Sequence, residues 1–423
     1  MSYRGRSNPF PMDSPVLTRP VAPPEIRAAH WTRSMERSVL RQMLAVVSRP
    51  GILSFAGGLP APDLFPTADY SAALSKVLST DPGALQYGPP FAPLKDHIVG
   101  LMAERGVACA PEQIFLTTGA QQALDVLTRF LLDPVGQVLL EELVYTGIRQ
   151  AVASYRPEVL PVRTDLETGI EVDEVVDYLE RGAVPAYLYV IPDAHNPLGV
   201  SVSQEKRLRL AEVAAAYGLP IIEDDPYGFL SYDGRCLPPI RAYNDSHVFY
   251  VGSFSKILAP ALRLGWLVAP EALVPKLTVI KEAGDLESSA LTQRAVAAYL
   301  DGGYLPEHVA RLQAEYRLRR DTMLRAMERY FPSGVIWTKP RAGMFIWARL
   351  PEYVDAGPLL ETAVEREKVA FIPGQAFAQP GVSAHNYMRL NFSNCCLADI
   401  EEGIERLGRV LGAVISDTKS LAN

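Results

Sequence analysis

The chain has 423 residues, a length that favours more than one domain. Its residues are 48% apolar and 21% charged, a composition typical of a globular protein. Its formal net charge of −7 argues against bulk nucleic-acid binding, which requires basic surfaces. No apolar run is long enough for a membrane span, and the start "MSYRGRSNPFPMDSP" lacks the apolar core of a secretory signal. We therefore expect a cytoplasmic protein with no membrane or nucleic-acid partner.

Cysteine and histidine are few and dispersed. The cysteines show no C-x-x-C spacing and no metal spacing; they are Cys109, Cys236, Cys395 and Cys396. We interpret them as reduced thiols. The six histidines are scattered along the chain, so no zinc site is predicted.

The first part of the chain is rich in proline, and we expect about 25 residues of extended arm there. A helix is predicted at 35–47, with apolar residues on one face. The segment 52–66 then indicates a strand that runs into a Gly/Pro loop.

Helices and strands alternate from Tyr70 onward. The predicted helices are at 71–78, 92–104, 121–132, 172–181 and 204–217. The predicted strands are at 114–117, 138–142, 186–191, 220–223, 247–251 and 264–268. This alternation indicates βαβ units and hence a mostly parallel sheet.

The pattern changes after Asp301. A long helical stretch at 305–331 is followed by strand-like segments and a final helical pattern from Leu397. We therefore expect a large domain at 70–301 and a small α+β domain at 302–423. Residues 1–69 are expected to form an N-terminal arm and helix that belong in part to the small domain.

The first polar feature is the junction "LTTGAQQALDVL" at 116–127, where a predicted strand ends and a helix begins. A helix N-terminus exposes free N–H groups and the positive end of its dipole, which suits a phosphate. Gly119 would let the backbone approach a ligand closely. An ordinary strand-to-helix turn has the same pattern, so this junction alone does not decide.

Polar residues also follow two further strands. Asn196, in "IPDAHNPLG", comes after a predicted strand, and open α/β sheets bind ligands at the carboxyl ends of their strands. In "PIIEDDPYGFL" three acids end another strand, and Asp224 and Tyr227 are spaced to converge on one ligand. The alternatives are a plain turn asparagine and a solvated acidic loop.

The segment "VGSFSKILAPALRLGW" places Lys256 just beyond a buried strand. A lysine in an apolar setting has a lowered pKa and can act as a nucleophile or base. Ser253, Ser255 and Arg263 are suited to hold a phosphate. The alternative, a lysine that extends to solvent, fits a helix face better than a strand end.

Arg389 lies inside the apolar strand pattern "YMRLNF" of the C-terminal part. A buried arginine needs an anionic partner. That partner is either a buried acid or a substrate carboxylate, and the sequence leaves both open.

The order of these features resembles that in the class I/II aminotransferases, which are fold-type I enzymes dependent on pyridoxal 5′-phosphate (PLP). The resemblance extends from about Arg41 to Leu411. The segments "SFAGGLPAPDLFP", "LQYGPP" and "SFSKILAPALRLGW" are similar to the branch that contains 2-aminoadipate (kynurenine-type) and multi-substrate aminotransferases. The resemblance implies an α/β fold, with a large domain built on a mostly parallel seven-stranded sheet and a smaller α+β domain.

The implied reaction moves an amino group between an L-amino acid (aromatic, apolar or 2-aminoadipate-like) and a 2-oxo acid, expected to be 2-oxoglutarate, in alternating half-reactions. By this resemblance, Lys256 carries the cofactor covalently and moves the proton. Asp224 pairs with the pyridine nitrogen. Asn196 and Tyr227 bind the phenolic oxygen of the ring, and Tyr145 stacks on the ring face. No metal is implied.

The residues that the resemblance assigns to the cofactor phosphate are Thr118, Gly119, Ala120, Gln121, Ser253, Ser255 and Arg263. Tyr87 matches a tyrosine that reaches the phosphate from a second subunit, so a homodimer with a shared active site is expected. Arg389 would clamp the substrate α-carboxylate, with Gly58 and Asn196 beside it. Arg41 aligns with an arginine that faces the substrate side chain, although an exposed helix arginine would have the same pattern.

The chain departs from the family pattern at Ala120, His195 and Leu198. These departures bear on substrate range and cofactor affinity rather than on reaction type, and His195 could also reach the active site. A PLP-dependent lyase or oxidase on the same scaffold is the alternative, since a fold does not fix a reaction. A remoter alternative is an aminotransferase-like transcription regulator, but regulators of that kind carry a basic DNA-binding domain, which we do not expect before the first predicted helix.

Overall fold

The computed structural model describes residues 27–29, 31–32, 51–234 and 236–421. The chain divides into two units, residues 1–35 and residues 36–423. In the first unit, the described residues include a short 3₁₀ turn at Trp31 and Thr32. The second unit holds the whole of the architecture described below. The helix predicted at 35–47, and Arg41 with it, lies outside the described residues.

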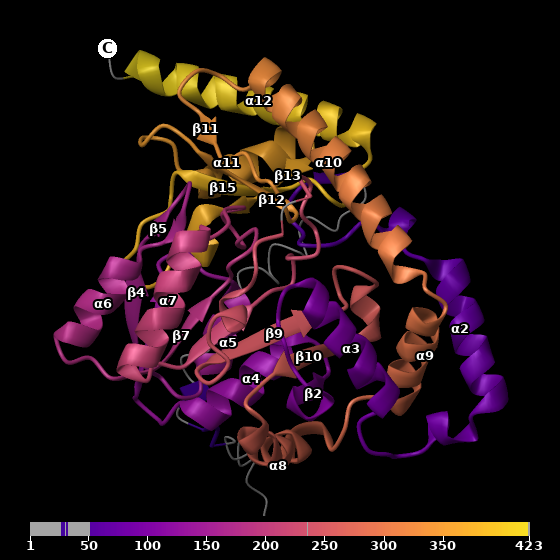
Figure 1. The fold of residues 1–423 in the computed structure, drawn as a ribbon. Coiled ribbons are helices and arrows are strands. Elements are labelled where there is room, and N and C mark those ends of the chain that lie inside the picture. The colour runs from indigo at the N-terminus through magenta and orange to yellow at the C-terminus, as the bar shows by residue number, and fades with distance from the viewer. Residues whose placement is uncertain (1–26, 30, 33–50, 235, 422–423) are drawn as a thin grey trace, which may run out of the picture. The chain divides into compact units, whose positions relative to one another are not determined.

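A seven-stranded sheet is the centre of the second unit (Figure 1). In spatial order its strands are β2 (Ile114–Thr117), β10 (Gly265–Val268), β9 (Val248–Ser253), β8 (Ile221–Asp224), β7 (Pro185–Val190), β3 (Gln137–Glu141) and β4 (Glu158–Val162). Only β10 runs antiparallel to its two neighbours, and the other pairs are parallel. The carboxyl ends of all strands except β10 therefore lie at one edge of the sheet.

The sheet is buried on both faces, which explains why its strands are apolar without interruption. Alternate residues of β7 enter different cores. Tyr187 and Tyr189 pack into the larger core, whereas Leu188 and Val190 pack into the smaller one with residues of α6 (Val172–Glu180) and α7 (Gln204–Tyr217).

The remaining helices of this part are α2 (Thr67–Thr80), α3 (Ala92–Glu104), α4 (Ala120–Leu131), α5 (Thr146–Val152), α8 (Val274–Asp285) and α9 (Ala290–Asp301). Local signals fix several of their ends. Ser203 caps the N-terminus of α7 by accepting a hydrogen bond from the backbone of Lys206, and Gly218 ends that helix in the left-handed conformation. None of the helices in the described part of the chain has the length and apolarity that a membrane crossing needs.

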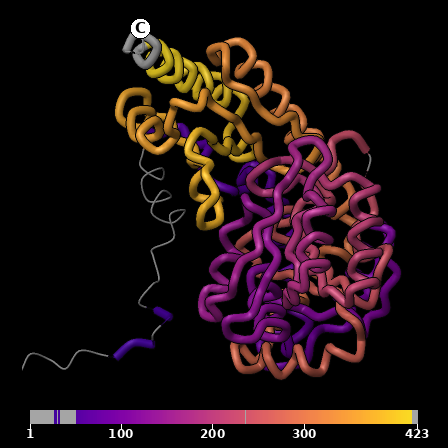
Figure 2. The backbone as a smooth tube through the Cα atoms, turned by 90° about the vertical axis from the view of Figure 1, so that its left-hand side faces the viewer, coloured from indigo at the N-terminus to yellow at the C-terminus, as the bar shows by residue number. Residues whose placement is uncertain are grey.

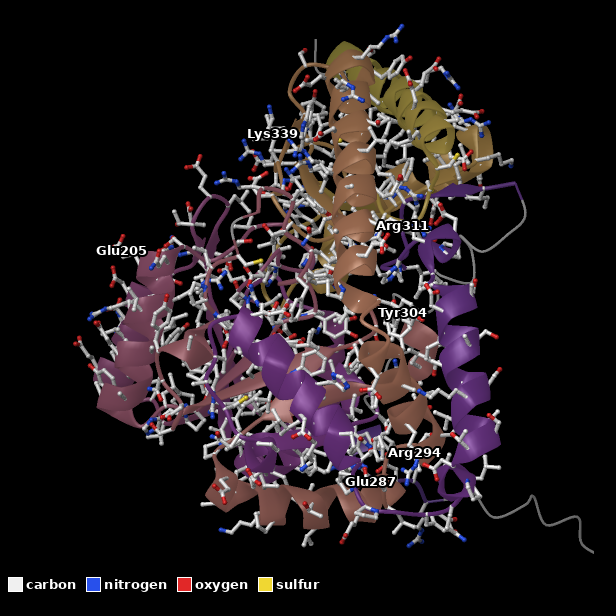
Figure 3. The ribbon with its side chains drawn as sticks, turned by 45° about the vertical axis from the view of Figure 1, so that its right-hand side comes forward. Glu205, Glu287, Arg294, Tyr304, Arg311 and Lys339 are labelled. Carbon is white, nitrogen blue, oxygen red and sulfur yellow. The ribbon has the colours of Figure 1, made fainter. Side chains whose placement is uncertain are left out.

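A smaller domain is built on the antiparallel sheet β11 (Ile336–Trp337), β12 (Phe345–Arg349), β15 (Tyr387–Asn391) and β14 (Ile372–Pro373), in that order. It also contains α11 (Ala356–Thr362), α12 (Leu397–Leu421) and the parallel pair β1 (Leu53–Ser54) and β13 (Val369–Ala370). Figure 2 shows the orange-to-yellow C-terminal chain gathered at one end of this unit. Helix α10 (Leu305–Tyr330) begins shortly after α9 and runs to this end; in Figure 3, Tyr304 marks the residue before the helix and Arg311 lies in its first half.

The expected fold class is confirmed, and most predicted elements are present with bounds within a few residues. Outside segment 164–170, four helices and strands of the large part were not predicted from the sequence, namely β4, α5, α8 and α9. Strand β4, "EVLPV", contains Pro161 and is tolerated because it lies at the sheet edge. Segment 164–170 forms a two-stranded hairpin, β5 (Thr164–Asp165) with β6 (Gly169–Ile170), that was also not predicted.

Candidate active site

The candidate site lies at the carboxyl edge of the sheet, where loops from separate strands meet. Thr118 and Gly119 follow β2, Asn196 lies in the loop after β7, Asp224 ends β8 and Ser253 ends β9. Because these strands are mutually parallel, their ends share one edge whatever the distance between them in sequence. Arg389 reaches the same place from β15 of the smaller domain, since its guanidinium donates to the Asn196 side chain.

Lys256 lies in a turn three residues beyond β9. Its Nζ donates a hydrogen bond of 2.8 Å to the carbonyl oxygen of Gly58. Burial of the ammonium, with the positive charges of Arg389 and Arg263 nearby, lowers the pKa of Lys256 to about 8. About a tenth of this amine is thus unprotonated at pH 7, far more than for an ordinary lysine, and the unprotonated amine is the state that a nucleophile or base requires.

Asp224 is buried, with only one of its two oxygens satisfied. Its Oδ2 accepts a hydrogen bond of 2.7 Å from the hydroxyl of Tyr189, whereas Oδ1 has no partner. Burial raises the pKa of Asp224 to about 7, and the charge of Asp225 adds to that effect. A buried carboxylate oxygen without a donor is costly, so Oδ1 marks a place for a ligand that donates a proton.

The other two acids of the run are also buried, so a solvated acidic loop is excluded. Both Glu223 oxygens accept backbone N–H groups, from Ile240 and Arg241. Asp225 accepts hydrogen bonds from Arg105 and from the hydroxyl of Tyr250. Only Asp224 of the three keeps an oxygen for a ligand.

The side chains of Asn196 and Arg389 are hydrogen-bonded to each other. Arg389 Nη1 donates to Asn196 Oδ1, and Nη2 donates to the carbonyl of Ala56, both at 2.7 Å. The guanidinium lies over the rings of Phe345 (4.2 Å to the centroid) and Phe377 (4.8 Å). No buried acid pairs with Arg389 among the described residues, and burial lowers its pKa to about 10. An incoming carboxylate would supply the missing charge.

Gly58 and Tyr227 complete this end of the site. The Gly58 carbonyl binds Lys256, and it is the neighbouring Ala56 that contacts Arg389. The Tyr227 ring meets Phe345 edge to face at 6.0 Å, and its hydroxyl interacts with the Asn196 side chain. Burial raises the pKa of Tyr227, so it is a hydrogen-bond donor at neutral pH.

The turn before α4 forms an anion cradle of the kind that its sequence predicts. Gly119 has φ +84° and precedes the first helical residue, Ala120. A Cβ at Gly119 would lie only 2.7 Å from Arg263 Nη2, so any other residue there would displace the Arg263 guanidinium. Arg263 donates through the same nitrogen to the carbonyl of Thr118. The free N–H groups of α4 and the Arg263 cation therefore face one small volume.

Four further predicted residues line this region. The hydroxyl of Ser253 accepts a hydrogen bond of 3.1 Å from the backbone N–H of Ser255. The hydroxyl of Tyr145 donates to Gln121 Oε1 at 3.4 Å, and Gln121 donates to the carbonyl of Gly147. Burial raises the pKa of Tyr145, and the charge of Asp224 acts in the same direction. Tyr145 is therefore close enough to Asp224 for their charges to interact.

Tyr87 is not brought to the site within one chain. The relative exposure of Tyr87 is 87%, and that of Leu85 in the same segment is 74%. His195 and Leu198 lie in the same loop as Asn196, and both are buried. His195 Nε2 lies 2.9 Å from Glu141 Oε2 at the end of β3, so the imidazole faces this acid.

The sequence interpretation missed residues that support the site from behind. These residues are Tyr189, Glu141 and Arg105. Their sequence surroundings show no unusual pattern, and only the assembled fold brings each of them into contact with a residue of the site loops. Tyr189 is next to Ile222 in the β7–β8 register, which places its hydroxyl beside Asp224. Two tyrosines in "PAYLYV" were the available signal. Among the described residues there is no cluster of His, Cys, Asp and Glu side chains suited to a metal.

Comparison with known proteins decides the family. Residues 63–407 match the family of class I and II aminotransferases. The chain belongs to this family. It is 40% identical to an aromatic-amino-acid aminotransferase of Thermococcus litoralis over 89% of this chain and 92% of the relative. It is 38% identical to a 2-aminoadipate transaminase of Thermus thermophilus over 90% and 96%.

A solved structure agrees with this assignment. A kynurenine aminotransferase of Pyrococcus horikoshii in complex with PMP is 36% identical, with a TM-score of 0.86 over 92% of this chain and 97% of that chain. The protein is thus a PLP-dependent aminotransferase with the fold-type I architecture.

The residues present fit PLP. The unpartnered oxygen of Asp224 suits a protonated ring nitrogen. The cradle of Gly119, the α4 N-terminus and Arg263 suits a phosphate group. Lys256, with its lowered pKa, suits an aldehyde.

Proposed function

We propose that this aminotransferase exchanges an amino group between an L-amino acid with an aromatic, apolar or 2-aminoadipate-like side chain and a 2-oxo acid, with 2-oxoglutarate as the acceptor. The observation that carries the proposal is the convergence of Lys256, Asp224 and Arg389 at one sheet edge. The relatives named for aromatic amino acids and 2-aminoadipate support the choice of side chains.

Lys256 and Asp224 would carry the chemistry of the cofactor. When bound, PLP supplies an aldehyde that condenses with amines and a pyridinium ring that accepts the electron pair left at the substrate Cα. Asp224 Oδ1 would hold the ring nitrogen in its protonated state. Lys256 Nζ, once released from the cofactor, would remove and return the proton as a general base, for which a pKa near 8 is suitable.

Arg389 would hold the α-carboxylate of either substrate. Its planar fork matches a carboxylate, and two aromatic rings fix its plane. Asn196 would position the Arg389 guanidinium through their 2.7 Å hydrogen bond. Together with Tyr227, it would also donate to the phenolic oxygen of the cofactor.

The phosphate would be held by Thr118, Gly119, Ala120, Gln121, Ser253, Ser255 and Arg263. We further propose that Tyr87 of a second subunit reaches this phosphate. An exposed tyrosine beside an exposed leucine supports a contact surface at this segment. The functional unit would then be a homodimer with shared sites.

A donor and acceptor panel tests the proposal. Phenylalanine, tyrosine, kynurenine, leucine and 2-aminoadipate would each be supplied with 2-oxoglutarate or pyruvate, and both products would be quantified. With 2-oxoglutarate we expect glutamate and the new 2-oxo acid in equal amounts; with pyruvate, any amino product would be alanine. Release of ammonia or carbon dioxide, or uptake of oxygen, would instead identify a lyase or an oxidase.

The same panel tests Arg41. If Arg41 faces the substrate side chain, Arg41→Ala should reduce kcat/KM for 2-aminoadipate more than for phenylalanine, because only the former carries a distal carboxylate. An equal loss for both donors would remove this role from Arg41.

A further inference from the structure

Four buried charged residues form a cluster at the base of the active-site loops, namely Arg105, Asp193, Arg207 and Asp225. Arg105 Nη2 donates to Asp193 Oδ2 at 2.7 Å and to Asp225 Oδ2 at 2.9 Å. Arg207 donates to both oxygens of Asp193, at 2.6 Å and 3.2 Å. Each of the four is less than 10% exposed. Burying four charges is costly unless they are paired, and here each of the four has an opposite charge as a partner.

The two acids belong to the two loops that carry proposed cofactor contacts. Asp193 precedes Asn196 by three residues in the loop after β7, and Asp225 directly follows Asp224 at the end of β8. Arg105 comes from the C-terminal end of α3. One nitrogen of one side chain therefore links both loops to a helix that is remote in sequence.

We propose that Arg105 is a positioning residue for the cofactor, one that fixes the Asn196 loop against the Asp224 loop and offsets the charge of Asp225 beside Asp224. The inference rests on the proposed roles of Asn196 and Asp224. It assigns no contact between Arg105 and cofactor or substrate.

The two acids depend on Arg105 unequally. Asp193 keeps a second cation, Arg207, whereas Arg105 is the cation that the structure pairs with Asp225. The further partners of Asp225 are neutral, namely the Tyr250 hydroxyl and the backbone N–H of Gly228. Without Arg105, the negative charge of Asp225 next to Asp224 would lose its nearest compensation.

Other titratable groups facing the cluster do not replace this cation. Burial raises the pKa of Glu223 to about 7 and also raises the pKa values of Cys236 and Tyr250. None of these groups gains a positive charge on protonation. The environment of Asp224 should therefore respond to the charge at Arg105 in particular.

Packing leaves little freedom around Arg105. Its guanidinium lies over the Phe229 ring, 5.8 Å from the centroid. A Cβ at Gly228 would lie 2.4 Å from Arg105 Nη2 and equally close to Asp225 Oδ2. The loop of Asp225 thus wraps against the guanidinium with a glycine at the closest approach.

The test compares holoenzymes with Arg105→Gln, which removes the charge, and Arg105→Lys, which keeps it. We expect the PLP dissociation constant to rise by about ten- to a hundredfold in Arg105→Gln, the scale seen for groups that orient a site from behind. The visible absorbance of the bound cofactor should titrate at higher pH in Arg105→Gln, because the loss of a cation favours protonation nearby. Arg105→Lys should leave that titration close to the wild-type one.

Two further variants separate positioning from general loss of stability. Arg241→Gln removes a buried arginine near the amino end of β9, where Arg241 donates to the carbonyls of Asp245 and Val248. It should lower the unfolding temperature with little change in PLP affinity. Asp225→Asn added to Arg105→Gln removes the uncompensated charge, and should return the cofactor titration toward the wild-type pH.

The proposal is overturned if Arg105→Gln lowers the unfolding temperature as Arg241→Gln does but leaves PLP affinity and the cofactor titration unchanged. Asp224→Asn distinguishes this failure from a failure of the proposed function. If Asp224→Asn also leaves the titration unchanged, the role of Asp224 is wrong. If Asp224→Asn shifts it and Arg105→Gln does not, only the inference about Arg105 fails.

Discussion

The two oxygens of Asp224 differ in their surroundings, because Oδ2 accepts a hydrogen bond and Oδ1 has no partner, and this asymmetry gives a prediction. Asp224→Asn should reduce the rate of transamination at saturating PLP by about 10²–10³-fold, the scale of losing one preorganised electrostatic contact. Tyr189→Phe removes only the hydroxyl that donates to Oδ2 and should cost much less. Steady-state rates for the two variants check this, and a similar loss in both would contradict the assignment of Oδ1 to the ring nitrogen.

Lys256 should make the stability of the cofactor-free protein depend on pH. Its pKa is about 8 in the folded protein and returns toward 10.5 on unfolding. The unfolded chain therefore binds more protons between these values, so this residue's contribution makes stability rise with pH across that window. Below pH 8 the buried charge costs stability, and Lys256→Met should raise the unfolding temperature at pH 7.

The gain in Lys256→Met should shrink as the pH rises from 8 toward 10.5. Lys339→Met, at an exposed lysine of the smaller domain, is the matched control and should show no such dependence (Figure 3). Thermal unfolding of the three cofactor-free proteins at several pH values measures the effect. A gain for Lys256→Met that does not vary with pH would show that the lysine is not buried as a charge.

At the scale of elements, Gly119 precedes α4 and matters in two ways, because its backbone has a positive φ and because it leaves space beside the Arg263 guanidinium. Gly119→Ala should cost about 1–2 kcal/mol of stability, because alanine is strained at positive φ. Gly218→Ala, at the end of α7, is also strained because Gly218 has φ +63° in the left-handed helical region, but a Cβ there meets nothing within 4 Å. Only Gly119→Ala should also weaken PLP binding, by about tenfold, the scale of one lost charge-assisted hydrogen bond.

Unfolding temperatures and PLP titrations on this pair of glycine variants check the prediction. The two variants should lose comparable stability and differ in cofactor affinity. If Gly218→Ala weakens PLP binding as much as Gly119→Ala does, the effect comes from general loosening rather than from the anion cradle.

The elements were predictable where one periodicity dominates. The helices at 92–104 and 204–217 and the strand at 114–117 have the predicted bounds, because their apolar spacing, proline and capping residues agree. Strand β4 was missed because Pro161 is a poor strand signal unless the strand is known to be at an edge. Helices α8 and α9 were missed although their apolar spacing is no weaker than that of α3 and α7.

The site was predictable only in the part that interrupts an apolar pattern. Lys256, Asp224 and Arg389 are such interruptions. Tyr189 reaches Asp224 because β7 lies next to β8, and Arg105 reaches Asp225 because of the position of α3. No local sequence pattern predicts either arrangement. Predicting them requires the assembled sheet.

At the scale of the whole molecule, Arg389 joins the smaller domain to a loop of the large sheet. Arg389 on β15 binds the Ala56 carbonyl and the Asn196 side chain, so segments more than 300 residues apart in sequence meet at one guanidinium. Any change in the position of the smaller domain would be transmitted to the proposed carboxylate site. Among the described residues, Tyr87 has a proposed contact that would come from a second subunit.

Mixed dimers test whether Tyr87 acts across subunits. Lys256→Ala removes the base of its own site but leaves Tyr87 for a partner, whereas Tyr87→Phe does the reverse. If sites are shared, a mixture of the two variants refolded or exchanged together at limiting PLP should be more active than the sum of the separate samples, because each hybrid has one intact site. Lys256→Ala mixed with Arg389→Ala is the control, since Lys256 and Arg389 meet within one chain and no hybrid site is intact. Equal behaviour of the two mixtures, with no gain in either, would place Tyr87 outside the active site.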